Sequence, residues 1–403
     1  MFIYFLGIHI YNQLDPMVAL ISELEADGLV MPNYGESILE LSRQLDRGSG
    51  DLIGDNQKKV FMLIDGLGYN LVKGIMERGE VKSELLSKST MKRITSVFPT
   101  ITPNVLSSVY SGMTPAEHGV LGMEMPLKGA GSIVHVFKWT PVFKHDAKMN
   151  IDPCELFPRS QIIERLASKK NLASLCDEQF INSPVTKAIM NCERVPFISF
   201  DDMLVKLSRL TDEGKHDYIY VYYDAVDHMS HEYSPVSKEV EEKIKGMLLS
   251  IDRILLKSLK KNGYDLVITA DHGQTVVTEK EMIRIGPKSE IMKFLSMPPW
   301  CEKRVRVADV LPGKEKQFED CFAKTYGKYG YLIESEEAIR SGIFGANTVP
   351  EDRRHLFGTH IMLSKFNYAF MFDYLGLDKR VRPVSGQHGG LSPGEMYIPA
   401  ILY

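Results

Sequence analysis

Three short apolar runs stand out in the pattern of hydrophobic and polar positions, and an aspartate follows each of them. The runs are 60–64 before Asp65, 218–223 before Asp224, and 266–270 before Asp271. Continuous apolar runs of this length are typical of strands that are buried on both faces of a parallel sheet. We therefore expect three parallel strands, each with an aspartate at its carboxyl end.

The segment between the second and third runs has the spacing of an amphipathic helix. Apolar side chains recur three or four positions apart from 236 to 259, whereas lysine and glutamate fill the other face. Pro235 precedes this stretch and suits the first turn of a helix. Strand, helix and strand in this order form a right-handed crossover, so we predict a doubly wound α/β sheet.

A mixed pattern interrupts the chain after the third run. It includes a strand-like stretch at 305–307, an amphipathic stretch at 314–326 and a helix-like stretch at 335–341. A chain of 403 residues exceeds the size at which a single core usually stops growing. We interpret 280–345 as an inserted α+β cap lobe, and 1–279 together with 346–403 as the core.

Composition excludes several classes of partner. The chain has 48 basic and 52 acidic side chains and no long basic tract, so we expect neither a nucleic-acid polymer nor an anionic membrane surface as partner. Its five cysteines form no C-x-x-C pair, which favours free thiols and a cytoplasmic location.

The first eleven residues are strongly apolar. They lack basic residues and a small-residue cleavage site, and they are shorter than the ~20 residues that span a bilayer. We expect an extra edge strand, or a start codon placed too far upstream, rather than a signal peptide.

Side chains that bind metal ions recur where the predicted strands end. Ligands of doubly wound sheets bind beyond the carboxyl ends of the strands. The candidates there, or in loops that can reach that edge, are Asp65, Asp227, His231, Asp271, His272 and His388. Asp227 and His231 are four residues apart, so one helical turn brings them to the same side. Taken alone, an aspartate before glycine, such as Asp65, is more often part of a turn, and a lone histidine is more often a hydrogen-bonded surface or core residue. Asp224 and His228 are competing candidates.

A hydroxyl group accompanies these candidates at a predicted helix start. Thr102 is a favoured cap, Pro103 a favoured first helical residue, and Gly112 ends the apolar spacing that follows. The positive end of a helix binds phosphate and lowers the cost of forming an alkoxide. A threonine that only caps the helix is the alternative. Six nitrogen or oxygen ligands and one hydroxyl suffice for two metal ions, which points to two-metal phosphoryl transfer.

Two segments around Thr102 carry a family resemblance. Residues 98–104 (FPTITPN) and 111–119 (SGMTPAEHG) resemble the nucleophile segment of the type I phosphodiesterase/nucleotide pyrophosphatase family, within the alkaline phosphatase superfamily. The resemblance implies an alkaline phosphatase-like three-layer α/β/α sandwich with a mostly parallel central sheet. It also implies that Thr102 is the nucleophile, with Thr100 as a nearby competitor, and that His118 is structural.

The resemblance further implies two divalent metal ions, with Zn²⁺ as the expected metal, and assigns their ligands. One ion takes Asp227, His231 and His388, and the other takes Asp65, Asp271, His272 and Thr102. One position departs from the family pattern. The family's nucleotide pyrophosphatases usually place a phosphate-holding asparagine where this chain has Met123, followed by Glu124, so nucleotide specificity stays open.

The function implied by the resemblance is hydrolysis of a small phosphodiester or nucleotide through a phosphothreonine. A phosphomonoesterase or phosphonate hydrolase of the same superfamily is the nearest alternative. A sulfatase is disfavoured because the Cys/Ser-x-Pro-x-Arg signature is missing around Thr102. A non-catalytic, metal-stabilised binding protein is the alternative of another class. The sequence does not predict the oligomeric state.

Overall fold

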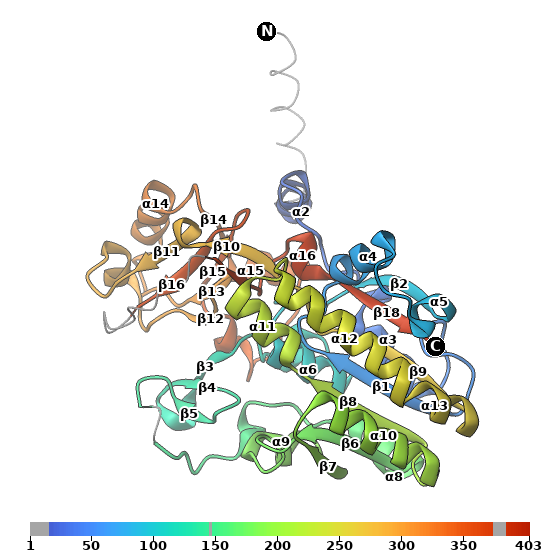
Figure 1. Cartoon of the computed structure of the whole chain (residues 1–403). Helices are drawn as coiled ribbons and strands as arrows, with labels where there is room; N and C mark the ends of the chain where they lie inside the picture. The colour runs from blue at the N-terminus through green and yellow to red at the C-terminus, as the bar shows by residue number, and fades with distance from the viewer. Residues whose placement is uncertain (1–15, 145–146, 374–383) are drawn as a thin grey trace.

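A seven-stranded sheet forms the centre of the computed structural model, which describes residues 16–144, 147–373 and 384–403 (Figure 1). The strand order is β2-β18-β9-β1-β8-β6-β7. The bounds are β1 (Lys58–Ile64), β2 (Thr90–Thr95), β6 (Leu172–Asp177), β7 (Glu193–Phe197), β8 (Tyr218–Tyr223), β9 (Tyr264–Thr269) and β18 (Tyr397–Leu402). Only β18 runs antiparallel to its neighbours, β2 and β9. The predicted mostly parallel sheet is therefore confirmed.

The three predicted strands are the three adjacent central strands of this sheet. The runs at 60–64, 218–223 and 266–270 correspond to β1, β8 and β9. β1 pairs in parallel with β8 on one side and with β9 on the other. Because these strands are parallel and in close register, their carboxyl ends meet at one edge of the sheet.

Helices cover both faces of the sheet. The evidence comes from side chains of β8 that point to opposite faces and contact different helices. Tyr220 packs edge-on against Tyr110 of α6 (Thr102–Ser111), with ring centroids 5.4 Å apart. Tyr223 packs against Phe200 of α10 (Phe200–Glu213), at 4.9 Å. Since odd and even positions of a strand face opposite sides, α6 and α10 lie on opposite faces.

Each helical layer has its own set of contacts. α6 packs with α3 (Ile38–Arg47) and α8 (Gln161–Lys170), whereas α10 packs with α12 (Lys238–Ile254) and α13 (Leu256–Asn262). Figure 1 shows α10, α12 and α13 lying across the sheet in the lower half of the molecule. The predicted three-layer α/β/α architecture is confirmed.

The crossover helix differs from its prediction at both ends. It begins at Lys238, because Ser237 caps it by accepting a hydrogen bond from the Val240 amide at 3.3 Å. Pro235 therefore lies before the helix rather than in its first turn, and the Val236 side chain is 74% exposed. The helix is also interrupted at Leu255, after which α13 begins. The remaining predicted apolar positions are buried: Val240, Ile244, Met247, Ile251, Leu255 and Leu259.

A second seven-stranded sheet lies beside the first, in the order β14-β15-β13-β12-β3-β4-β5. Its strands are β3 (Glu124–Leu127), β4 (Ser132–His135), β5 (Thr140–Pro141), β12 (Trp300–Glu302), β13 (Val305–Ala308), β14 (Gly330–Glu334) and β15 (His360–Ser364). The strand predicted at 305–307 is β13, and the two predicted helices are α14 (Glu315–Thr325) and α15 (Ser335–Arg340). The cap boundaries of 280–345 stay a prediction, and segments 124–141 and 360–364 also contribute strands to this sheet.

Shorter elements complete the part of the chain that the structure describes. The helices are α2 (Pro16–Ala26), α4 (Tyr69–Arg78), α5 (Glu84–Lys88), α7 (Pro115–His118), α9 (Pro184–Ile189), α11 (Ala225–Tyr233) and α16 (Pro393–Met396). The strands are β10 (Thr275–Thr278), which pairs with β17 (Val384–Gln387), and β11 (Met282–Ile285), which pairs with β16 (Ala369–Phe372).

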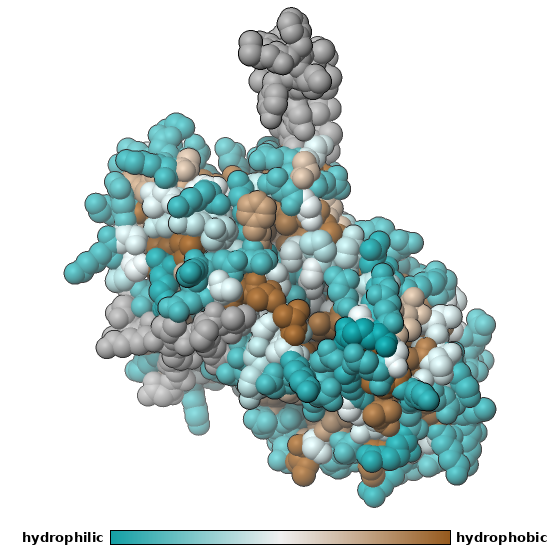
Figure 2. All heavy atoms as spheres, turned by 45° about the horizontal axis from the view of Figure 1, so that its top comes forward, coloured by the Kyte–Doolittle hydropathy of each residue, from teal (hydrophilic) through white to brown (hydrophobic). Residues whose placement is uncertain are grey.

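The face in Figure 2 is largely hydrophilic, with smaller apolar patches between polar side chains. Within the described ranges, no helix combines the length and the apolar character needed to cross a membrane. The edge strand expected within residues 1–11 lies outside the described residues.

Candidate active site

The strand-end aspartates Asp65 and Asp271 converge at the carboxyl edge of the central sheet. Asp65 follows β1 directly, and Asp271 lies two residues after the end of the neighbouring strand β9. The backbone amides of Gly66 and His272 both donate to Asp271 Oδ1, at 3.2 and 2.9 Å. Both aspartates are buried, so two carboxylates share a site from which water is largely excluded.

Gly66 allows the next element to approach these carboxylates. Its φ of 74° is in the left-handed region, and a Cβ at this position would lie 2.7 Å from Asp227 Cα. The Asp227 amide donates to the Asp65 carbonyl at 3.0 Å. The absence of a side chain at residue 66 therefore brings α11 against the end of β1.

Asp227 and His231 lie on one side of α11, as their spacing predicts. His231 Nε2 is 3.4 Å from Asp227 Oδ2. The competing candidates Asp224 and His228 line the cavity beside this pair. Neither belongs to a group of converging metal-type ligands among the described residues.

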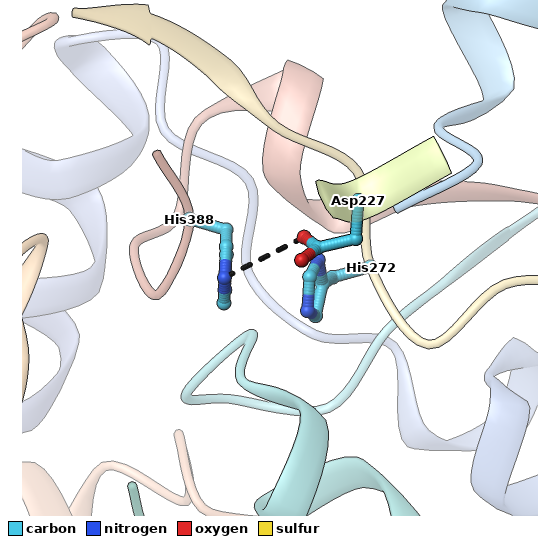
Figure 3. Close-up of side chains that lie close together, drawn as sticks. All are labelled: Asp227, His272 and His388. Atoms are coloured by element: carbon cyan, nitrogen blue, oxygen red, sulfur yellow. Dashed lines mark ion pairs between the residues drawn. The ribbon is translucent and has the colours of Figure 1, made fainter. Parts of the chain in front are cut away.

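His388 reaches the same place from the loop after β17. Its Nε2 lies 3.7 Å from Asp227 Oδ1. Its ring stacks on that of His272, with centroids 3.9 Å apart and an interplanar angle of 14°. Figure 3 shows the side chains of His388, His272 and Asp227 gathered together, with the ion pair between His388 and the Asp227 carboxylate drawn as a dashed line. Asp227 and His388 are 161 positions apart in the sequence and nevertheless lie together. With Asp65, His231, Asp271 and His272 they form what we call the metal-type cluster.

The three histidines share one hydrogen-bonding arrangement, in which Nδ1 contacts a backbone carbonyl. The acceptors are Gly386 O for His231 (2.8 Å), Gly273 O for His272 (3.1 Å) and Thr100 O for His388 (2.9 Å). A carbonyl only accepts, so each Nδ1 carries the proton and each Nε2 presents a lone pair. Backbone carbonyls that orient histidines in this way are typical of metal ligands.

Thr102 is placed beside this cluster at the start of α6. The N-cap is Ile101, not Thr102, because the first helical hydrogen bond runs from the Val105 amide to the Ile101 carbonyl at 3.0 Å. Thr102 is the first helical residue, and Pro103 is the second. The Thr102 hydroxyl therefore makes no cap; it lies 3.3 Å from Asp65 Oδ2 and 3.2 Å from His272 Nε2.

The competitor Thr100 is used differently. Its hydroxyl donates to the Gly390 carbonyl at 2.9 Å and accepts from the Gly389 amide at 3.0 Å. These bonds tie the segment before α6 to the loop that carries His388. Of the two threonines, only Thr102 directs its hydroxyl into the metal-type cluster.

The electrostatics of the cluster require a compensating positive charge. Burial, together with the neighbouring carboxylates of Asp271 and Asp227, raises the pKa of Asp65 well above its ordinary value. Burial and the Asp227 carboxylate likewise raise the pKa of Asp271. Burial, reinforced by the other imidazoles, lowers the pKa of His272. Carboxylates and neutral imidazoles held together out of water are a suitable environment for a divalent cation.

Unpartnered ligand atoms support the same conclusion. Within the described part of the chain, Asp65 Oδ1 and Asp271 Oδ2 are buried and have no hydrogen-bond partner. Two groups of candidate ligand atoms converge to within 4.8 Å of one another: those of Asp65, Asp271 and His272, and those of Asp227, His272 and His388. The residues present therefore fit two metal ions, with His272 between the two groups and His231 next to Asp227.

Sequence reasoning missed the side chains that hold these ligands in place. The Tyr222 hydroxyl donates to Asp65 Oδ2, and the Gln274 amide donates to Asp227 Oδ1. Tyr222 is two residues before the end-of-strand Asp224, on the face of β8 that points to α6, and Gln274 follows His272 by two residues. Neither position has a sequence pattern of its own, because each contact depends on strand or loop packing.

A cavity of about 280 Å³ opens onto the cluster. Its lining includes Asp65, Thr102, Asp227, His231 and His388, together with apolar side chains of α6, β6, β8 and α9. A substrate can therefore reach the Thr102 hydroxyl and the metal-type ligands from a single cavity.

Comparisons with known proteins identify relatives of the fold. Among curated proteins, none matches the sequence significantly. Among solved structures, murine ectonucleotide pyrophosphatase/phosphodiesterase 5 is similar with a TM-score of 0.62 and 16% identity, over 86% of this chain and 88% of that chain. Phosphonoacetate hydrolase from Sinorhizobium meliloti 1021, in complex with phosphonoacetate, has a TM-score of 0.62 and 16% identity, over 87% and 91%. At these identities the likeness establishes the fold.

The family itself follows from the sequence. The model of the family described as type I phosphodiesterase / nucleotide pyrophosphatase matches residues 60–287, which is more than half of the chain. This range includes Thr102 and five of the six candidate nitrogen or oxygen ligands, all except His388. With the resemblance around Thr102 and the shared fold, the chain belongs to the type I phosphodiesterase / nucleotide pyrophosphatase family.

Proposed function

We propose that this protein is a two-zinc phosphodiesterase or nucleotide pyrophosphatase-like hydrolase that acts through a phosphothreonine on Thr102. The observation that carries the proposal is the position of the Thr102 hydroxyl. It lies at the start of α6, within 3.3 Å of two members of a buried cluster of metal-type ligands, and it faces a cavity. The family membership supports a phosphoric ester hydrolase in general.

The proposed ligand assignment is the one that the family resemblance implies. Asp227, His231 and His388 would hold one zinc ion, and Asp65, Asp271, His272 and Thr102 the other. When bound, such ions lower the pKa of hydroxyl groups in contact with them and neutralise charge that develops on phosphoryl oxygens. The protein's own part is to hold the ligands in place through Tyr222, Gln274 and the three backbone carbonyls.

The reaction is a double displacement at phosphorus. Thr102 loses its hydroxyl proton, its Oγ1 forms a bond to phosphorus, and the bond from phosphorus to the leaving alcohol breaks as that oxygen takes up a proton. Water then attacks the phosphothreonine, the bond to Thr102 Oγ1 breaks, and the hydroxyl is restored. The positive end of the α6 dipole favours the negative charge on the phosphoryl group at this position.

A second structure of the murine enzyme supports the role of a threonine. In it, an inactive threonine-to-alanine variant is in complex with AMP. A phosphonate hydrolase is the second candidate, favoured by the similarity to phosphonoacetate hydrolase. In both cases the substrate is a small molecule; the zinc identity and the cytoplasmic location stay predictions.

Hydrolysis assays on zinc-loaded protein test the proposal. We expect faster turnover of bis-p-nitrophenyl phosphate than of p-nitrophenyl phosphate, and no phosphate release from phosphonoacetate. Faster monoester turnover would favour a phosphomonoesterase, and phosphate from phosphonoacetate would favour the second candidate.

The variant Thr102→Ala tests the nucleophile. We expect it to lose at least 1,000-fold in turnover, on the order of a removed nucleophile, while binding two equivalents of zinc. Thr325→Ala, which changes an exposed threonine on α14, should keep full activity. Turnover of Thr102→Ala within tenfold of the wild type would remove Thr102 from the proposed role, and absence of zinc-dependent hydrolysis by the wild type would indicate a binding protein.

A further inference from the structure

We infer that the cavity beside Thr102 binds an apolar, uncharged organic group of the phosphate ester, such as a short alkyl chain or a single ring. This inference rests on the proposed function, and it names the substrate class that this site selects. It is carried by the walls of the cavity, by their charge and by their distance from the Thr102 hydroxyl.

One wall of the cavity follows the helix that begins with Thr102. Leu106 and Tyr110 both line it, one and two turns further along α6. At 1.5 Å per residue, Tyr110 is about 12 Å from Thr102 along the helix axis. The cavity is thus continuous from the hydroxyl to a region well away from the metal-type ligands, where only the organic part of an ester can lie.

The other walls are also predominantly apolar. They are formed by β8, β6, α9 and the segments around them, through Tyr220, Tyr222, Leu175, Val185, Ile189, Met190, Phe137 and Phe180. Phe180 is 44% exposed, which places an aromatic ring where the cavity meets solvent. Apolar groups that leave water for such a surface gain about 0.8 kcal/mol per methylene, equal to about fourfold in an equilibrium constant.

Charge around the cavity disfavours anionic groups. Among the described residues that line it, none is lysine or arginine. The two carboxylates outside the metal-type cluster are Asp224 and Glu302. A second phosphate or a carboxylate on the organic group would therefore enter without a cationic partner, close to two acidic side chains.

Met123 reinforces this selectivity. Its side chain also lines the cavity. An apolar side chain there adds contact area rather than a hydrogen bond. The volume of about 280 Å³ is at the lower end of small-ligand pockets, so a short chain or one ring is enough to fill it.

A series of alkyl p-nitrophenyl phosphodiesters tests the inference on zinc-loaded protein. The methyl, butyl and hexyl esters share one leaving group, so p-nitrophenolate release reports the effect of the alkyl chain alone. We expect kcat/KM to rise two- to fourfold per methylene up to butyl, and the 5-carboxypentyl ester to be at least tenfold slower than the hexyl ester. Equal kcat/KM for all chains, or a faster carboxypentyl ester, would overturn the inference.

A cavity-filling variant with a matched control locates the effect. Thr186 on α9 lines the cavity, whereas the adjacent Lys187 is exposed and does not. Thr186→Phe should reduce the hexyl-to-methyl ratio of kcat/KM at least tenfold, and Lys187→Phe should keep the wild-type ratio. An unchanged ratio in Thr186→Phe would place the alkyl group elsewhere.

Binding measurements separate failure of this inference from failure of the proposed function. Calorimetric titration of zinc-loaded protein with methyl-, butyl- and hexylphosphonate needs no turnover. We expect affinity to increase with chain length in the wild type and much less in Thr186→Phe. Chain-dependent binding without hydrolysis would contradict only the proposed function, whereas hydrolysis with chain-independent rates and affinities would contradict only the inference.

Discussion

Gly66 shows how one residue without a side chain sets the distance between two metal-type ligands. It follows Asp65 directly and lies against Asp227, whose amide bonds to the Asp65 carbonyl. Any side chain here meets backbone atoms, which cannot move aside as a flexible side chain can. The close approach of β1 and α11 therefore depends on this glycine.

We predict that Gly66→Ala lowers kcat/KM for bis-p-nitrophenyl phosphate about 100-fold or more, because displacement of reacting groups by about 1 Å has effects of that size. Gly79→Ala is the matched control. Its φ of 63° is also left-handed, but a Cβ there meets nothing within 4 Å. Steady-state kinetics of both variants provide the measurement, and equal activity of the two would contradict the role of close approach.

His118 is a second residue whose environment predicts a measurable property. Its Nδ1 accepts from the Val120 amide at 3.0 Å, and its Nε2 lies 3.0 Å from Ser108 Oγ. Both nitrogens are thus used within the fold, as a structural role requires. Burial, with a smaller effect of Arg353, lowers the pKa of His118 to about 3.

This lowered pKa predicts acid sensitivity. Between about pH 6.5 and pH 3 the unfolded histidine binds a proton that the folded one does not, so its contribution to stability is complete above pH 6.5 and is lost as the pH falls. The expected slope of the free energy of unfolding against pH is about 1.4 kcal/mol per pH unit. This slope can be checked by urea unfolding of the metal-free wild type and of His118→Gln between pH 5 and 7. If the free energies of unfolding of the two proteins change in parallel with pH, His118 is not the source of the acid sensitivity.

At the scale of elements, a buried ion pair joins the second sheet to the loops that carry His272 and His388. Arg304, between β12 and β13, bonds to both carboxylate oxygens of Glu395 in α16, at 3.0 and 2.8 Å. Glu395 also accepts from the Gly390 amide at 2.7 Å, and its carbonyl accepts from the Gly273 amide. The second sheet therefore supports the cluster without contributing a metal-type ligand to it.

Arg304→Met should destabilise the protein by about 3–5 kcal/mol, because it leaves the Glu395 carboxylate buried without its partner. It should also weaken zinc binding, since the loops after His272 and His388 lose a common anchor. Lys316→Met removes an exposed ion pair with Asp320 and should change stability by less than about 1 kcal/mol. Urea unfolding and zinc titration compare the two; a loss of under about 1 kcal/mol in Arg304→Met would contradict the anchoring role.

At the scale of the whole molecule, we expect the cluster to couple metal binding to stability. Asp65, Asp227 and Asp271 come from three different segments, and folding brings their carboxylates together out of water. Metal ions that bind only the folded protein stabilise it, by about 2.7 kcal/mol at a free concentration 100 times the dissociation constant. The metal-free protein keeps the repulsion without this compensation.

We therefore predict that chelation lowers the melting temperature, and that the metal-free variant Asp271→Asn melts above the metal-free wild type. The side-chain oxygen of asparagine can still accept hydrogen bonds from the backbone amides of Gly66 and His272, but one of the repelling negative charges is removed. The same variant should gain less from added zinc than the wild type does. Differential scanning calorimetry with and without zinc checks all three expectations. If metal-free Asp271→Asn melts below the metal-free wild type, repulsion between the carboxylates does not limit the stability of the metal-free protein.

Much of the architecture was predictable from local pattern. The apolar runs specified β1, β8 and β9, and the cap-lobe elements were found at 305–307, 314–326 and 335–341 because periodicity reflects burial. Element ends were less predictable. Ser237 caps α12, so Pro235 lies before the helix instead of in its first turn, and Ile101 rather than Thr102 is the N-cap of α6, because caps depend on individual hydrogen bonds.

The kinds of candidate ligand, the strand ends that several of them follow and the family to which they point could all be predicted from the sequence. Which of these residues meet depends on how distant segments pack. His272 lies between both groups of ligands, Tyr222 and Gln274 hold the carboxylates, and Arg304 reaches Glu395 from another sheet. The physical reason is that burial and backbone periodicity leave a local pattern in the sequence, whereas contacts between distant segments arise only from packing.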